Sequence, residues 1–421
     1  MNPCCVGVCG GGPVEAVSPL SPLRTLGVSM VDLVGATAVE QDVVGVLSED
    51  SVLLWSTTRH ALIRHIPLAH FDLPSCFASS EIIDLIGAAG PYRVVVKVER
   101  MDPVAQVRHH YVMLDLLDGR GWEVASKDAT HNCLEYCSPS HLYILCQQNR
   151  QLSTYPLEGA MDDPPSPGGR RLVPLGSLAG DTGQIWENSR LLSFFVSEEN
   201  QEATLLCESP SRKLLSALKL NVCTGAVSSV QLRSEPGAAG CSARADFPTH
   251  VYGKGCYMPS ANTYYTVAHA HRASDDERDA TAGGADEVWC LDVAQGSWRR
   301  VCVLECELYC YWLSASLCGS YVNGYLIQMS LEKSEPDYYL LRLRVTAPTL
   351  QGLAWGALKR ALLALPPQKR ELLNQCALPL PLAQALDTWK RGEDLDNQLE
   401  PRCQGLPQDH SKPPLLHRFL M

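Results

Sequence analysis

The sequence lacks the short motifs that mark most catalytic and nucleotide-binding sites. It contains no G-x-G-x-x-G, P-loop, H-E-x-x-H or G-x-S-x-G pattern. It also lacks a run rich in Lys and Arg, and its formal net charge is −11. Because nucleic-acid binders concentrate positive charge, the sequence argues against that class of partner. We therefore expect no enzyme activity, no cofactor and no nucleic-acid partner.

Metal-binding spacings are missing as well, although the chain has 18 cysteines. No C-x-x-C pair occurs, and the regular spacings are of four residues, at Cys133 and Cys137 and at Cys302, Cys306 and Cys310. Residues four apart on a strand share a face, so a metal site is conceivable, but both sets lie in apolar, strand-like runs. We interpret these cysteines as reduced, buried, small hydrophobic residues.

The histidines offer two further metal candidates. His109 and His110 are adjacent, so on a strand their rings point to opposite faces. His269 and His271 share a face next to acidic residues, but this stretch has the composition of a solvated loop. We therefore expect no metal site.

Export and membrane signals are weak. Met1–Pro13 is apolar and glycine-rich but has no basic region ahead of a hydrophobic one. Leu308–Leu331 carries no charge and is long enough to span a bilayer. Its serine, asparagine and glycine residues divide it into two strand-length pieces, so we expect a buried hairpin there. The sequence thus predicts no membrane contact and a cytoplasmic protein, with the nucleus left open as a second location.

Short apolar runs between tight turns dominate the chain up to Pro348. Val43–Leu47, Ser51–Trp55 and Ala61–Ile66 predict three strands. Asp286–Trp298 is an aromatic strand that ends in Leu-Asp, followed by a Gly turn and a Trp, and Tyr111–Trp122 repeats this order. The pattern resembles the outer half of a kelch blade, in which the Trp covers the gap between neighbouring four-stranded sheets. The first three strands resemble a WD-type blade as much as a kelch blade.

We interpret the sequence as an all-β propeller of about six blades with a short C-terminal helical module. A pair of β-sandwiches is the alternative. Trp122 and Trp298 are expected to be buried, and Met161–Arg171 and His271–Gly284 to form exposed, mobile loops. The expected boundaries are a flexible N-terminus at 1–24, a kelch-like propeller at 25–346, a helical module at 347–390 and a disordered tail at 391–421.

The strand rhythm stops at Pro348. Leu350, Ala354 and Leu358 then lie on one stripe of a predicted helix, and a Leu-Pro-Leu-Pro segment follows further on. Together they resemble a SOCS box, which binds the elongin B/C adaptor through its helix and selects a cullin scaffold through its Leu-Pro segment. The resemblance implies that the stripe binds the adaptor and that the cullin is selected by Leu378, Pro379, Leu380 and Pro381. An F-box, or helices that only pack on the propeller, are the alternatives.

These resemblances imply the substrate-recognition subunit of an elongin/cullin-type ubiquitin ligase. The propeller would bind an unknown substrate protein, and the tail would bind elongin B/C and a cullin. The alternative is a non-enzymatic propeller scaffold for protein–protein interaction. Because propellers bind through loops on a common framework, the sequence names neither the substrate nor the face that binds it.

Overall fold

The computed structural model describes most of the chain before residue 346. The described residues are 14–19, 33–40, 42–57, 61–77, 80–101, 106–129, 133–157, 171–176, 180–209, 215–234, 248, 251–269, 286–304, 308–315, 321–328 and 337–345. The expected loops at 161–170 and 271–284, and the whole tail from 346 on, lie outside the described residues.

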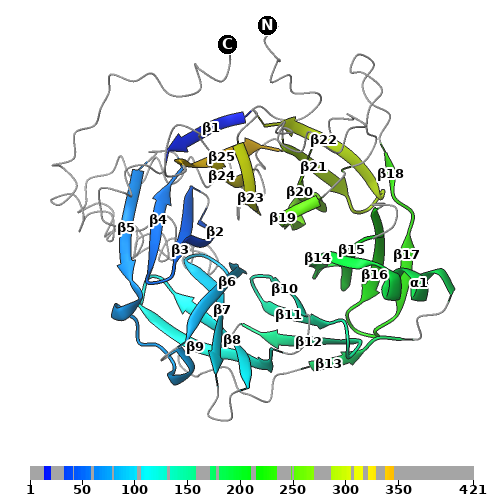
Figure 1. The fold of residues 1–421 in the computed structure, drawn as a ribbon, viewed down its shortest axis with the longest axis horizontal. Coiled ribbons are helices and arrows are strands. Elements are labelled where there is room, and N and C mark those ends of the chain that lie inside the picture. Colours follow the sequence, from blue (N-terminus) through cyan, green and yellow to red (C-terminus); the bar gives the residue numbers. More distant parts are fainter. Residues whose placement is uncertain are drawn as a thin grey trace, which may run out of the picture.

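The described strands form four four-stranded antiparallel sheets and one nine-stranded sheet, arranged around an axis (Figure 1). A single parallel pair, Lys254 with Trp312, joins the two halves of the nine-stranded sheet, so we describe these halves as two further four-stranded units and number the units 1 to 6. Unit 1 consists of β2 (Leu33–Glu40), β3 (Val43–Ser48), β4 (Ser51–Ser56) and β5 (Ala61–Pro67). Unit 2 consists of β6 (Glu81–Ala88), β7 (Arg93–Met101), β8 (Val107–Asp115) and β9 (Arg120–Asp128). Unit 3 consists of β10 (Cys133–Cys137), β11 (His141–Cys146), β12 (Gln151–Pro156) and β13 (Arg171–Pro174).

The second half of the ring follows the same plan. Unit 4 consists of β14 (Arg190–Ser197), β15 (Glu202–Glu208), β16 (Leu215–Asn221) and β17 (Val227–Val230). Unit 5 consists of β19 (Val251–Met258), β20 (Thr263–His269), β21 (Asp286–Asp292) and β22 (Ser297–Val303), and the short β18 (Arg233–Ser234) pairs with β22. Unit 6 consists of β23 (Leu308–Ala315), β24 (Tyr321–Gln328), β25 (Asp337–Arg344) and β1 (Val14–Pro19). The chain is therefore a β-propeller, and the sandwich alternative is wrong.

Strands from the two ends of the described chain close the ring. β1 pairs antiparallel with β25, so the N-terminal segment supplies the outermost strand of the unit that the last three strands begin. The predicted flexible lead-in at 1–24 is wrong in this part, because Val14–Pro19 belongs to a sheet. A ring closed in this way covers a sheet edge that would otherwise present unpaired backbone groups.

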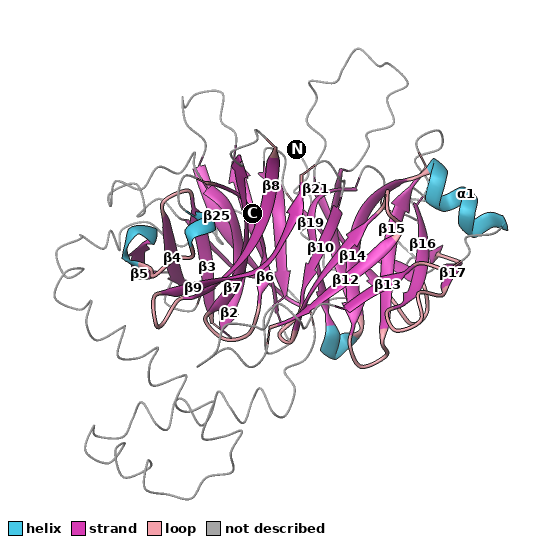
Figure 2. Cartoon of the chain, turned by 90° about the horizontal axis from the view of Figure 1, so that it is seen from below, coloured by secondary structure: helices cyan, strands magenta, loops and turns pink. Residues whose placement is uncertain are grey.

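Helices are a small part of the described fold. The α-helix α1 (Gly180–Asn188) precedes unit 4, an exception to the predicted all-β propeller, and the described 3-10 turns are η2 (Leu68–His70), η3 (Ser75–Phe77) and η5 (Pro259–Ala261). In the side view the strands occupy one disc-shaped layer and α1 lies at its edge (Figure 2). No described helix is long and apolar enough to cross a bilayer. The uncharged stretch predicted as a hairpin is the antiparallel pair β23–β24.

Apolar contacts between neighbouring units hold the ring together. Each of the six apolar clusters joins two consecutive units, such as Leu54 of unit 1 with Val96 of unit 2. Trp298 is 1% exposed and lies in the cluster between units 4 and 5, as predicted. Trp122 is half-buried against the cluster between units 2 and 3. The core thus consists of six apolar clusters, each between two neighbouring sheets, because apolar side chains on the facing sides of the sheets pack against each other.

The predicted Leu-Asp-turn motif is a repeated backbone structure. In the β8–β9 turn, Asp115 Oδ1 accepts from the backbone N–H groups of Leu117 (3.0 Å) and Asp118 (3.1 Å), and Gly119 has φ +66°. The same two bonds and a positive-φ glycine four residues on recur at Asp292 and, as a third copy, at Asn221. The side-chain oxygen holds the turn and the glycine provides the left-handed conformation, so the chain reverses tightly at these three turns, in units 2, 4 and 5.

Candidate functional site

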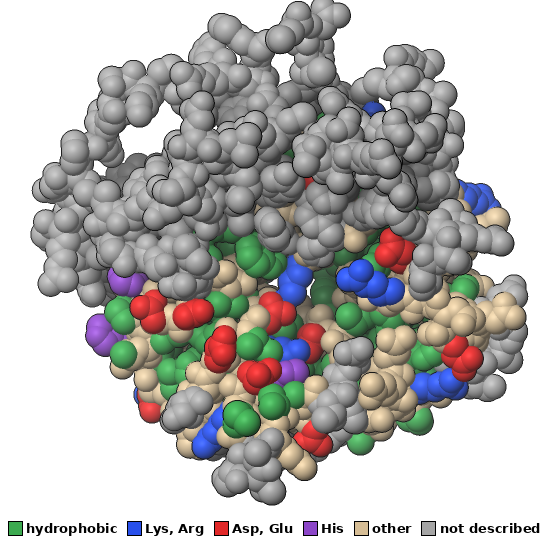
Figure 3. All heavy atoms as spheres, viewed as in Figure 1, with side chains coloured by type: hydrophobic (Ala, Val, Ile, Leu, Met, Phe, Trp, Pro, Cys, Tyr) green, Lys and Arg blue, Asp and Glu red, His purple; other side chains and the backbone are tan. Residues whose placement is uncertain are grey.

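A cavity of about 440 Å³ lies at the centre of the ring. Its wall comes from the first strands of all six units, namely β2, β6, β10, β14, β19 and β23. Figure 3 shows one face of the molecule, hollowed at the centre with basic side chains at the edge of the hollow. Binding sites in proteins are concave and mostly apolar with a few fixed polar groups, and this channel has that character.

One ion pair crosses the channel. Lys254 on β19 of unit 5 forms a short contact with Asp84 Oδ2 on β6 of unit 2, and its Nζ also donates to the backbone oxygen of Leu85 at 3.1 Å. These two units are not neighbours in the ring. The Lys254 side chain is 42% exposed and Asp84 24%, so the pair remains accessible to solvent and to a ligand. A ligand that enters the channel therefore meets the Lys254 ammonium group, which is already paired with Asp84.

A second polar group is buried in the channel wall. Glu135 on β10 accepts from Lys97 Nζ at 2.8 Å and from the Tyr111 hydroxyl at 2.8 Å. Both donors come from unit 2, so these two hydrogen bonds connect unit 3 to unit 2. Burial, followed by the nearby Glu135 charge, raises the pKa of Tyr111 well above its ordinary value, so its hydroxyl stays protonated and donates. Because a buried charge needs such partners, Glu135 is anchored and not free to move.

Aromatic rings form the wall between units 4 and 5. Phe195 stacks on Tyr257 and Tyr264, with ring centroids 4.8 and 4.6 Å apart. β19 reaches this stack through Gly255, where an added Cβ would lie 2.1 Å from the Tyr264 hydroxyl oxygen. Only glycine fits that contact, which explains a glycine in the middle of a strand.

A separate cluster of metal-ligating side chains lies in unit 2, away from the residues that line the channel. Cys76, His110 and Glu123 each place one possible ligand atom within 4.8 Å of the others. As predicted from their adjacency, His109 and His110 point to opposite faces of β8: His109 contacts Glu99 and His110 contacts Glu123. The sequence pointed to His110 only as one of two adjacent histidines and linked it to neither Cys76 nor Glu123, because the three residues lie on three elements.

The remaining predicted sites fall into two groups. Cys302 and Cys310 are buried in the apolar cluster between units 5 and 6, and Cys133 and Cys137 are half-buried. Cys306, His271 and the predicted adaptor-binding and cullin-selecting residues lie outside the described residues: Leu350, Ala354, Leu358, Leu378, Pro379, Leu380 and Pro381. Cys137 also lines the channel, but the sequence predicted it as a small hydrophobic residue and not as a ligand.

Comparison with known proteins adds little beyond the fold. No protein-family model matches the chain, and no curated protein matches it. Among solved structures, the chain is similar to the RRP9 WD40 repeats, at 10% identity over 79% of this chain and 99% of that one, with a TM-score of 0.42. It is also similar to an oligogalacturonate lyase from Vibrio parahaemolyticus, at 8% identity over 72% of this chain and 75% of that one, with a TM-score of 0.40. At these values the similarity carries no functional argument, and the propeller architecture follows from the strand order of the chain itself.

Proposed function

We propose that the chain is a non-enzymatic binding protein whose propeller holds a segment of a partner protein in the central channel. The observation that carries the proposal is the cavity of about 440 Å³ to which all six units contribute. Its wall combines aromatic rings with Lys254, whose ammonium group pairs with Asp84, and this suits a peptide that has one large apolar side chain and one polar one. A few buried side chains of the partner would contribute most of the binding free energy, as is usual in protein interfaces.

A peptide-display experiment tests the channel. A random peptide library is selected against the purified chain, and the enriched peptides are measured against Ala88→Arg, which places a long side chain in the channel wall. The matched control is Leu172→Asp on the outer strand β13, where Leu172 is 44% exposed. We expect Ala88→Arg to weaken binding by at least about 10-fold, roughly 1.4 kcal/mol, and Leu172→Asp to leave it unchanged. Equal binding by all three proteins refutes a channel site.

In its finer form, the proposal assigns the chain to an elongin/cullin-type ubiquitin ligase as the substrate-recognition subunit. Its support is the sequence alone: the stripe Leu350, Ala354 and Leu358, followed by Leu378–Pro381. A helix of this kind binds in a groove through a few apolar anchors. Under this proposal the propeller selects the substrate and the tail connects it to the ligase. A plain scaffold, with the tail packed on the propeller, is the alternative.

Binding to recombinant elongin B/C tests the tail. Removing one buried Leu from such an interface costs about 2–4 kcal/mol, so the Leu350→Ala, Leu358→Ala double variant should bind at least roughly 30-fold more weakly. Lys359→Ala, off the stripe, is the control and should bind as the wild type does. An unchanged melting temperature in the double variant assigns the loss to the interface. If the wild type does not bind elongin B/C, the ligase assignment fails and the scaffold function remains.

A further inference from the structure

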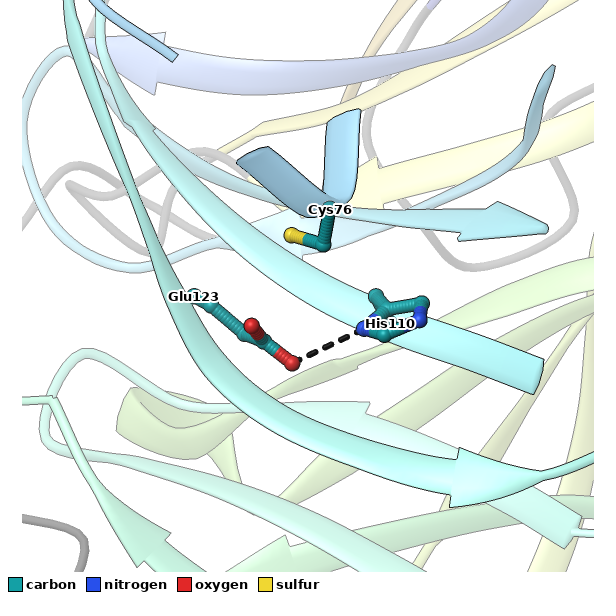
Figure 4. Close-up of side chains that lie close together, drawn as sticks. All are labelled: Cys76, His110 and Glu123. Atoms are coloured by element: carbon teal, nitrogen blue, oxygen red, sulfur yellow. Dashed lines mark hydrogen bonds and ion pairs between the residues drawn. The ribbon is translucent and has the colours of Figure 1, made fainter. Parts of the chain in front are cut away.

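Three side chains that are distant in sequence converge at the face of unit 2 that packs towards unit 1. Cys76 lies on η3, His110 on β8 and Glu123 on β9 (Figure 4). His110 Nδ1 and Glu123 Oε1 are 2.8 Å apart, and the Cys76 thiol lies within 4.8 Å of both ligand atoms. The cluster thus brings together a sulfur, a nitrogen and an oxygen ligand.

The fold fixes the direction of each side chain. Glu123 pairs directly with Val112, two residues from His110, so Glu123 and His110 project from the same face of the sheet. A register shift between Tyr111 and Val112 interrupts the regular pairing at this point, as β-bulges do where a side chain is re-aimed. The backbone oxygen of Ser75 accepts from Arg100 Nη1 at 3.1 Å and so holds the turn that carries Cys76.

The environment of the cluster suits a divalent cation. Cys76 is 3% exposed and packs in the apolar cluster of units 1 and 2, whereas the Glu123 side chain is 37% exposed and leaves a path to solvent. A thiolate and a carboxylate bring two negative charges, which a doubly charged ion neutralises at the border of an apolar core. Tetrahedral zinc bonds of about 2.0–2.3 Å place neighbouring ligand atoms about 3.5 Å apart, a separation these side chains reach by small rotations.

We propose that Cys76, His110 and Glu123 form a zinc site with three protein ligands and a fourth position open to solvent. On binding, the His110 ring takes the tautomer that carries its proton on Nε2, so that the Nδ1 lone pair binds the ion, and the Cys76 thiol releases its proton to bulk water. Zinc accepts all three ligand types, and a site with three protein ligands keeps one position for water or an incoming group. The bound ion ties the connection between units 1 and 2 to β8 and β9. This site is one that the sequence did not predict.

Metal titration of the full chain tests the proposal. The protein is stripped with a chelator and titrated with Zn²⁺ against a chromophoric competitor, and Co²⁺ is added separately to read out a sulfur-to-cobalt charge-transfer band. We expect one ion per chain, a rise in melting temperature on zinc addition, and the cobalt band. Cys76→Ser and His110→Gln should each weaken zinc binding by at least about 10-fold, and Cys76→Ser should abolish the band.

Two matched variants separate this site from the other cysteines and histidines. His109→Gln changes the adjacent histidine, which contacts Glu99 on the other face, and Cys133→Ser changes a half-buried cysteine of unit 3. Both should bind zinc as the wild type does. Should Cys76→Ser misfold, His110→Gln and Glu123→Gln provide the same comparison. Absence of stoichiometric binding by the wild type, or binding that survives in His110→Gln, overturns the proposal.

Discussion

Glu198, in the turn between β14 and β15 of unit 4, accepts hydrogen bonds from several side chains of unit 3. Glu198 follows β14, and its Oε1 accepts from Ser138 Oγ at 2.6 Å, from His141 Nδ1 at 3.0 Å and from the Tyr143 hydroxyl at 3.1 Å, with Ser140 as a fourth donor. Burial raises the pKa of Glu198, but these hydrogen bonds outweigh burial and lower it from 4.5 to about 2. The ionised form is therefore favoured in the folded protein.

This lowered pKa predicts how stability depends on pH. A carboxyl group whose pKa is depressed by folding stabilises the protein above its unfolded pKa, here near 4.5, and loses that contribution as the pH falls towards 2. A shift of about 2.5 units corresponds to at most about 3.4 kcal/mol. Because the Glu198 side chain is 34% exposed, solvent screening reduces the expected contribution to roughly 1–2 kcal/mol.

The substitution Glu198→Gln removes the charge while it keeps the shape and one acceptor oxygen. We expect it to lower the free energy of unfolding by roughly 1–2 kcal/mol at pH 7, with a difference from wild type that shrinks below about pH 5. Urea denaturation followed by tryptophan fluorescence at pH 7, 5, 4 and 3.5 measures both. Glu202→Gln, which removes a more exposed pair with Lys219, should change stability by less than about 1 kcal/mol. Equal stability of Glu198→Gln and wild type at pH 7 would refute the reasoning, and so would a difference that does not change with pH.

Two further perturbations test the ring itself. At Gly119, φ is +66° and a new Cβ would make only an ordinary contact, 3.7 Å from the His70 oxygen, so Gly119→Ala should cost about 1–2 kcal/mol from the backbone conformation alone. Gly225→Ala should cost clearly more, because its Cβ would lie 2.0 Å from the Pro174 oxygen, and comparison of the two denaturation midpoints checks this. Deletion of residues 1–19 removes β1 and exposes the edge of β25, so it should lower the melting temperature by at least about 5 °C and promote aggregation. Calorimetry and light scattering measure the two effects. Deletion of residues 1–13 keeps β1 and should cause neither.

The sequence predicted inner strands of several units well, but it did not predict β2 or β19, the first strands of units 1 and 5. Val43–Leu47 and Ser51–Trp55, for example, are apolar runs that correspond to β3 and β4, which lie between two other strands of their sheet. β2 and β19 contain glycine and small or polar residues, because one side of these strands faces the channel and not a neighbouring sheet. A strand that lines a channel has no reason to show a regular apolar pattern, so periodicity alone does not reveal it.

The turn motif shows where the sequence pattern was informative and where it was incomplete. Leu-Asp followed by a Gly turn was recognised twice, and both copies hold their turns with the aspartate side chain. The third copy uses Asn221, whose amide oxygen accepts the same two bonds as a carboxylate does. The same pair of hydrogen bonds recurs with a different residue, so a search for Asp alone finds too few copies of the turn.

The candidate sites were beyond prediction for a related reason. Lys254 and Asp84 belong to units on different sides of the ring, and Cys76 reaches His110 and Glu123 only after η3 folds back onto unit 2. The channel site depends on closure of the ring, and the metal cluster depends on a local register shift. Neither feature places the site residues at a fixed separation along the sequence. Short-range sequence patterns therefore do not predict the residues to which we assign function. This is expected, because a binding site is selected for its chemistry and not for the regular structure that such patterns describe. Because the channel and the zinc cluster share no residues, a variant of one should leave binding at the other unchanged, and their tests are independent.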